Sequence, residues 1–427
     1  MKNTANREGY LFTRKYSGYI FTLLFLLYVF DYADRMVVNS MFTFIRHDWG
    51  TTDTQNGWLV SVIYLAIGIL TFPVSLLVDR WSRTKTIGLM AIVWSLATAV
   101  CALSGNYVQL FMARIFIGFG EAGYAPGGSA LISGIYPFEK RSRMLGFWNA
   151  SIPLGSALGV TMGGIIAQSL GWKHAFGLVA LPGLIIAILF LFVKDYKTVD
   201  LSVLDKMNNK VKMKGKDIVQ EFLSKPSLIF TYFGIAAVVF VTTAMIVWLP
   251  TYFEEVRGIE PKTAGTLAGA VMLLALIGAP LGGVLIDRWR KTQKKARLLF
   301  PSVSTLISAV LLLVALLLGG TAQLIVLFIF GIFIMTFISG ATAVTQDVIH
   351  PGLRATSYAI AVAVQNLIGS FTAPIVLGRI SDLSGIAAAM SILPFVLVVG
   401  AILFYLGSRF YLKDVDRAAK VRLEAAN

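Results

Sequence analysis

Apolar segments long enough to cross a membrane recur along almost the whole of this 427-residue chain. A transmembrane helix needs about 20 mostly apolar residues, and the sequence offers twelve such segments in two sets of six. The first set is 18–43, 55–77, 86–104, 107–133, 144–168 and 174–193, and the second is 227–252, 263–286, 298–318, 321–346, 355–380 and 386–409. We expect an all-α membrane protein with a six-helix bundle at 1–193, a linker at 194–226 and a second six-helix bundle with its tail at 227–427.

The composition agrees with the bilayer as the main solvent of the chain. Hydrophobic residues make up 57% and charged residues 14%, with a mean hydropathy of +0.76, whereas a soluble domain carries about 25% charged residues. Of the 37 Lys and Arg residues, 30 lie in segments that face one side and 5 in the loops of the other side. Basic loops face the cytoplasm, so we expect both termini and the linker there. We therefore attribute the net charge of +15 to the basic residues of the cytoplasmic loops and not to nucleic-acid binding.

An internal repeat relates the two sets of six. Asp-Arg-Trp followed by basic residues ends the second expected helix of each half, at Asp79 and at Asp287, 208 residues apart. A second pair, "GIIAQSLG" at 164–171 and "GRISDLSG" at 378–385, is separated by 214 residues. Repeats of this kind are typical of transporters whose halves rock about a central site.

The first of these loops resembles the Gly-x-x-x-Asp-Arg-x-Gly-Arg-Lys signature of the major facilitator superfamily, through Asp79, Arg80 and Arg83. Serines 75 and 82 stand where glycines are usual. Arg114, with the glycines at 118 and 120, resembles the fourth-helix signature of the same family. We expect the loops at Asp79 and Asp287 to form ion pairs that stabilise an outward-open state. The expected gating residues are Asp79, Arg80, Arg83, Asp287 and Arg288.

Three stretches narrow the resemblance within the superfamily. They are "DYADR" at 31–35, "RIFIGFGEAGYAPGGSALISGIYPFEKRSRMLG" at 114–146 and "HPGLRATSYAIAVAVQNLIG" at 350–369. They look most like bacterial Spinster-like transporters and the related anion:cation symporters, which move sugar acids and similar carboxylates. The resemblance implies a major facilitator fold of twelve helices in the plasma membrane, the bacterial inner membrane.

Five charged residues lie inside the expected spans, all on the first and fourth helices: Asp31, Asp34, Arg35, Arg114 and Glu121. Charges in a membrane are costly and normally face a partner or a water-filled cavity. The two helices are antiparallel. At a rise of about 1.5 Å per residue, Asp34 and Arg114 lie at similar depth, with Asp31 and Glu121 deeper. Asp31 and Arg35 are also four residues apart, so one helix face can carry both.

Two interpretations of this cluster are open. Fixed pairs Asp34–Arg114 and Glu121–Arg35 could hold helices together, although buried pairs are weak stabilisers. Alternatively, a carboxylate in a low dielectric takes up a proton readily, and its arginine is then free to bind a substrate anion. We favour the second, with Glu121 and Asp34 as proton carriers, Arg35 as the anion ligand and Arg114 tuning Asp34. Asp31, uncharged in many members of the family, is a second proton site or marks a small polar pocket.

Neutral side chains are expected to line the rest of the binding site, since the second half has no charge in mid-helix. For the tyrosines ordinary packing is the alternative. The candidates are Tyr28, Tyr64, Tyr124, Trp248, Gln365 and Asn366. Glycines at 155, 159 and 163 form a smooth face, which we expect to contact the helix at 263–286.

The sequence contains no phosphate-binding loop, metal-ligand spacing or nucleophile motif. We therefore expect no enzyme, no cofactor and no metal, with the proton gradient as energy source. The expected function is proton-coupled symport of a small organic anion, a carboxylate or sugar acid, by alternating access. The alternative is a Spinster-like exporter of lysolipids or amphiphilic drugs. A sensor or scaffold would carry an added soluble domain. The expected partners are the anion, protons and the lipid bilayer, with the protein as a monomer.

Overall fold

The computed structural model describes residues 11–80, 82–137, 144–145, 147–195, 221–349 and 354–417. Within these ranges the regular structure is entirely helical. The chain divides into two compact units. Unit 1 comprises Met1–Lys197, Ala244–Leu273 and Pro374–Ala389, and unit 2 comprises Thr198–Thr243, Leu274–Ala373 and Met390–Asn427. Most of the expected linker, 194–226, lies outside the described residues, and the expected boundaries at that linker stay a prediction.

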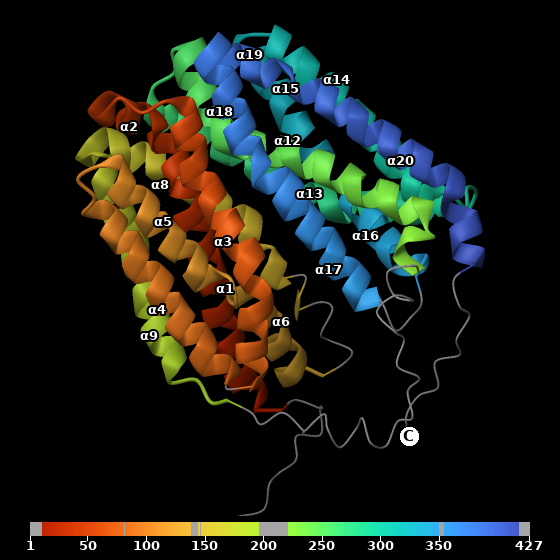
Figure 1. Cartoon of the computed structure of the whole chain (residues 1–427), viewed down its shortest axis with the longest axis horizontal. Helices are drawn as coiled ribbons and strands as arrows, with labels where there is room; N and C mark the ends of the chain where they lie inside the picture. The colour runs from red at the N-terminus through yellow and green to blue at the C-terminus, as the bar shows by residue number, and fades with distance from the viewer. Residues whose placement is uncertain are drawn as a thin grey trace, which may run out of the picture. The chain divides into compact units, whose positions relative to one another are not determined.

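Unit 1 is built mainly from helices that lie side by side (Figure 1). They are α1 (Arg14–Met36), the 3₁₀ turn η1 (Val37–Met41), α2 (Phe42–Trp49), α3 (Asp53–Arg80), α4 (Arg83–Ala102), α5 (Tyr107–Glu121), α6 (Tyr124–Ile135), α8 (Ser151–Leu170) and α9 (Trp172–Leu191). Side-chain oxygens of Thr13, Ser82 and Asn106 accept hydrogen bonds from first-turn amides and so start α1, α4 and α5. Gly50, with φ at 63°, ends α2 in the left-handed conformation that glycine tolerates best.

Unit 2 contains the remaining helices and parts of two long ones. The long helices α12 (Pro226–Arg257) and α13 (Pro261–Arg290) each contribute residues to both units, and so does α18 (Thr372–Ser384). The others are α14 (Ala296–Leu317), α15 (Gly320–Phe333), α16 (Ile338–Asp347), α17 (Arg354–Val364), the π-helical η3 (Gln365–Ser370) and α20 (Leu393–Asp416), while α19 (Ile386–Ser391) belongs mainly to unit 1. Asp347 joins α16 to its neighbours, since it pairs with Arg297 and accepts from the Tyr411 hydroxyl.

Ten helical segments of the described chain are long and apolar enough to cross a membrane. The expected spans at 18–43 and 107–133 are not among them. The second of these is divided between α5 and α6, which have 15 and 12 residues and are separated by residues 122–123. Large apolar side chains such as Leu96, Phe116 and Ile185 are about half exposed, as expected where lipid is the solvent. The total of twelve spans and the cytoplasmic position of the termini stay predictions.

The glycine face of α8 contacts a different partner from the expected one. A Cβ atom at Gly155, Gly159 or Gly163 would lie 2.2–2.5 Å from a backbone carbonyl oxygen of α1 or η1. These three glycines therefore allow α8 to pack directly on the helix that carries Asp31, Asp34 and Arg35. The expectation that they contact the helix at 263–286 is wrong, because a four-residue spacing marks a smooth face without specifying its neighbour.

Candidate functional site

Arg35 lies between two buried carboxylates in unit 1. Its Nη2 atom donates to Asp31 Oδ2 at 2.7 Å, one helical turn earlier on α1. Its Nε atom lies 2.8 Å from Glu121 Oε2, at the end of α5. Both carboxylate side chains are fully buried and the Arg35 side chain is 11% exposed. The contacts that helical spacing and depth suggested for Asp31, Arg35 and Glu121 are therefore present.

Asp34 and Arg114 are buried nearby but do not form the expected pair. Arg114 Nε donates to the Leu59 carbonyl, and Nη2 donates to the Arg35 carbonyl at 3.3 Å. Among the described residues no ion pair joins Arg114 to Asp34. Asp34 Oδ2 instead lies 3.3 Å from the Thr98 hydroxyl. Arg114 thus holds the backbone carbonyl of Arg35, and among the described residues the Asp34 carboxyl has no ion-pair partner.

Several buried polar atoms of this cluster have no hydrogen-bond partner in the described part of the chain. The atoms with neither a hydrogen bond nor an ion-pair contact among the described residues are Asp31 Oδ1, Asp34 Oδ1, Arg114 Nη1 and Glu121 Oε1. Arg35 Nε and Glu121 Oε2 form no hydrogen bond there either, but they face each other at 2.8 Å as an ion pair. An unsatisfied buried polar group costs about 1–3 kcal/mol, and more when it is charged. A cluster with this many open positions is poorly explained as a helix fastener. It suits groups that exchange protons or hold a polar ligand.

Aromatic rings adjoin the charged cluster on one side. Tyr28 stacks on Trp148 with ring centroids 4.4 Å apart, and it also contacts Tyr32 and Tyr124. The Arg35 guanidinium carbon lies 4.7 Å from the centroid of Tyr32, within the range of a cation–π interaction. Tyr28 and Tyr124, both expected in the binding site, therefore belong to the group of rings that reaches Arg35 through Tyr32. Trp148 and Tyr32 were not foreseen, since nothing in their spacing separates them from other core aromatics.

The other expected ligand residues lie in several places. Tyr64 on α3 is half-buried, close enough to Arg35 for electrostatic interaction. Trp248 is fully buried and packs on Phe42 with ring centroids 5.0 Å apart, and its role in the binding site stays a prediction. Gln365 and Asn366 are half-buried in η3 of unit 2.

The expected gating residues are only partly described. The side chains of Asp79, Arg80 and Arg83 lie outside the described part of the structure. Asp287 and Arg288 lie in the last turn of α13, where both are exposed. Their proposed role in an outward-open state stays a prediction.

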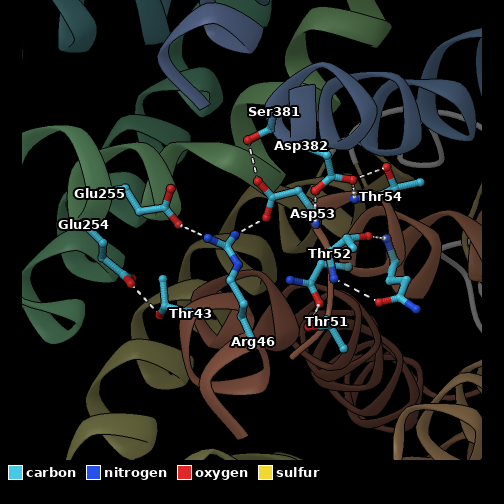
Figure 2. A network of polar contacts seen from close by, with 12 residues as sticks. Thr43, Arg46, Thr51, Thr52, Asp53, Thr54, Glu254, Glu255, Ser381 and Asp382 are labelled. Carbon is cyan, nitrogen blue, oxygen red and sulfur yellow. Dashed lines mark hydrogen bonds and ion pairs between the residues drawn. The ribbon is translucent and has the colours of Figure 1, made fainter. Parts of the chain in front are cut away.

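A second polar constellation, which we call the end network, gathers at one end of the unit 1 helices (Figure 2). Arg46 of α2 lies between Asp53 of α3 and Glu255 of α12, and its Nη1 atom is 2.6 Å from Glu255 Oε1. Thr43 donates to Glu254 at 2.6 Å. These contacts join the first 80 residues to helix ends from the second half of the sequence. The members of the end network are Thr43, Arg46, Asp53, Thr54, Glu254, Glu255, Ser381 and Asp382.

Asp382 of α18 caps the start of α3 within this network. Its Oδ1 accepts from the Asp53 amide at 2.6 Å, and its Oδ2 accepts from the Thr54 amide at 2.9 Å and from the Thr54 hydroxyl. The first amides of a helix lack intrahelical partners and carry partial positive charge. A carboxylate from a distant helix therefore stabilises this helix start, as Figure 2 shows.

The sequence repeat reappears here as a pair of equivalent contacts. Gln168 of α8 accepts from the Lys262 amide at 3.1 Å, at the start of α13. Lys262 is 208 residues after Thr54, and Asp382 is 214 residues after Gln168, which are the two offsets of the repeat. Gly164 approaches the carbonyl of residue 261 as Gly378 approaches that of residue 53. The end network was missed in the sequence, although the aligned Gln168 and Asp382 of the two echoes could have indicated it.

We next compared the chain with known protein families. The model of the Major Facilitator Superfamily matches residues 24–374. The chain belongs to the major facilitator superfamily. Its family and its relatives are transporters, so the expectation that the chain is not an enzyme is confirmed on that ground.

Two groups of relatives resemble the chain over most of its length. The hexuronate transporter of Bacillus subtilis (strain 168) is 29% identical over 76% of this chain and 79% of its own length. Protein spinster homolog 1 of Xenopus tropicalis is 28% identical over 96% of this chain and 85% of its own. Among solved structures, a bacterial homolog of the human lysosomal transporter Spinster has a TM-score of 0.82 at 21% identity, covering 94% of this chain and 99% of that one. That likeness shows the fold.

Proposed function

We propose that this major facilitator protein is a secondary transporter that carries a small organic anion, a carboxylate or sugar acid, together with protons. The observation that supports this most is the position of Arg35, held by Asp31 and Glu121 in a buried cluster. Arginine is well suited to bind carboxylates bidentately. Here Nη2 and Nε both face carboxylates of the protein, so a substrate carboxylate that binds at these atoms replaces a protein carboxylate.

Protonation of a protein carboxylate allows the substrate carboxylate to take its place at Arg35. A carboxylate that takes up a proton loses most of its attraction for the guanidinium, so Arg35 keeps only one of its two carboxylate partners and the charge of the cluster becomes more positive by one. An uncompensated buried charge is strongly unfavourable, so entry of an anion is favoured once the proton is bound. Asp31 and Glu121 are the proton sites of this scheme, and Arg35 is the anion ligand. Arg114 orients Arg35 through its backbone carbonyl.

The end network is the proposed outer gate of an alternating-access cycle. It joins helices of the two sequence halves through Arg46 and Asp382. Its contacts would break when this end of the protein opens. On the topology that the basic loops predict, this end faces away from the cytoplasm. We place the protein in the bacterial inner membrane as a monomer that uses the proton gradient and no cofactor.

A thermal-shift screen of the purified protein tests the substrate class. Stabilisation by D-glucuronate or L-galactonate, and not by lysolipids, is the expected result. In Arg35→Lys the charge balance of the cluster is kept but bidentate geometry is lost, so we expect the carboxylate shift to fall while the unliganded melting temperature changes little. An unchanged carboxylate shift in Arg35→Lys would remove Arg35 from the site.

A second candidate is an exporter of lysolipids or amphiphilic drugs. The similarity to protein spinster homolog 1 over 96% of this chain favours it, as do the aromatic rings beside Arg35. This function would also fit the fold. It predicts stabilisation by lysolipids and proton-driven efflux from vesicles, with no carboxylate uptake, so the same screen separates the two.

A further inference from the structure

The cluster on α1 and α5 has more negative than positive groups. Asp31, Asp34 and Glu121 face Arg35 and Arg114, so the fully ionised cluster would carry a charge of −1. Within the described part of the chain, the other titratable side chains near these groups belong to α1, α3, α4 and α6 and are phenols and a thiol. They are Tyr28, Tyr32, Tyr64, Cys101 and Tyr124. A buried net charge is costly, so a proton resident in the cluster is expected.

The ion pairs favour Asp34 as the site of that resident proton: Asp31 and Glu121 each face Arg35, at 2.7 and 2.8 Å, whereas no ion pair among the described residues includes Asp34. The Thr98 hydroxyl lies 3.0 Å from the Trp94 carbonyl oxygen and 3.3 Å from Asp34 Oδ2. A hydroxyl has a single proton to donate, and the carbonyl is the nearer acceptor. If Asp34 carries the proton, its carboxyl can donate to the Thr98 oxygen while the Thr98 hydroxyl donates to the Trp94 carbonyl. The remaining groups, Asp31, Glu121, Arg35 and Arg114, then sum to zero charge.

If the empty site is neutral, the charge of the substrate determines how many protons must bind with it to keep the site neutral. A monocarboxylate adds one negative charge, and a single proton on either Asp31 or Glu121 restores neutrality. Both carboxylates contact Arg35, at 2.7 and 2.8 Å, so either one can accept the proton and withdraw. We propose that Asp31 and Glu121 share one coupling proton across Arg35, so that monocarboxylate symport is electroneutral and depends on Asp31. This inference rests on the proposed function.

Replacing Asp31 with a neutral residue changes the number of protons needed to keep the site neutral. In Asp31→Asn the empty site carries a charge of +1, and a monocarboxylate neutralises it without a proton. The proton-to-substrate ratio should fall from one to zero. The charge moved per cycle should change from zero to −1. Asp31→Glu keeps the charge count and is the matched control.

The experiment measures D-glucuronate accumulation in proteoliposomes, with membrane potential clamped by potassium and valinomycin. One proton per anion gives about tenfold accumulation per pH unit, hence about 100-fold for the wild type at a gradient of two units, whatever the potential. Asp31→Asn should reach only about 1-fold at zero potential and be excluded about 50-fold at −100 mV inside. Asp31→Glu keeps the carboxylate, so its accumulation should still follow the pH gradient at one proton per anion and stay insensitive to the potential, whatever its rate of transport.

Each contrary result has a distinct meaning. Wild-type accumulation that changes with potential, or Asp31→Asn accumulation that still follows the pH gradient, overturns the shared-proton inference and leaves the proposed function standing. Calorimetry in buffers of different ionisation enthalpy supplies a second measurement without transport: the wild type should take up one proton per bound D-glucuronate, and Asp31→Asn none. A wild type that neither binds nor transports D-glucuronate or L-galactonate removes the proposed function, and this inference with it.

Discussion

Replacement of Asp382 with Ala should weaken the end network by an amount that its hydrogen bonds define. The side chain accepts from two amides and one hydroxyl at the start of α3. Loss of a capping side chain costs about 1 kcal/mol, and loss of a negative charge beside a helix N-terminus costs about 0.3–1 kcal/mol more. The sum is about 1.3–2 kcal/mol. Because Asp382 is exposed, the lower value applies, and it lowers the ratio of closed to open ends about 10-fold.

Gln168 provides a control at the equivalent position of the repeat. Its side chain accepts one neutral hydrogen bond from the Lys262 amide at 3.1 Å. A neutral hydrogen bond contributes about 0.5–1.5 kcal/mol. Because Gln168 is exposed, the lower part of that range applies, and Gln168→Ala should change the same ratio only about 2- to 5-fold.

Spin labels on the two sides of the network report this ratio. Val108 on α5 and Leu383 on α18 are 66% and 69% exposed, so cysteines there accept labels, in a background where the buried Cys101 is replaced by Ala. Asp382→Ala should enrich the longer distances measured by double electron–electron resonance more than Gln168→Ala. Identical distance distributions, or a larger change in Gln168→Ala, would refute the gate assignment.

Three further outcomes are expected. Gly159→Val should lower the melting temperature by the equivalent of about 1–3 kcal/mol, because a Cβ there would lie 2.5 Å from the Ala33 carbonyl oxygen. Gly18→Ala, with nothing within 4 Å of its Cβ, should leave the melting temperature unchanged or slightly raised. Asp34→Asn should keep one proton per transported anion, measured by reversal of the pH gradient, because an amide replaces a carboxyl that is already protonated; a ratio of zero would contradict that protonation state.

The contacts of Arg35 could be foreseen because they follow from regular helix geometry. Asp31 and Arg35 are separated by one turn, and a constant rise per residue brings Glu121 to their depth. The expected Asp34–Arg114 pair is absent among the described residues because it depended on the direction of the side chains around the helix axes. Depth along an axis does not fix the direction in which a side chain points around that axis, and Arg114 points to the Leu59 and Arg35 carbonyls instead.

Contacts between distant segments were harder to foresee. Asp53 and Asp382 are 329 residues apart, and no local pattern indicates that one caps the helix of the other. The repeat aligns Asp382 with Gln168, but only the structure shows that both positions cap the same kind of helix start. Periodicity likewise identified the glycine face of α8 without specifying that α1 covers it.

The most direct test of the central claim compares wild-type protein with Glu121→Gln in proteoliposomes that hold an acidic exterior. The wild type should accumulate D-glucuronate against its gradient. Glu121→Gln should lose that accumulation and keep counterflow exchange of the same anion, because Arg35 can still bind it when Glu121 is neutral. Undiminished proton-driven accumulation in Glu121→Gln would contradict the account.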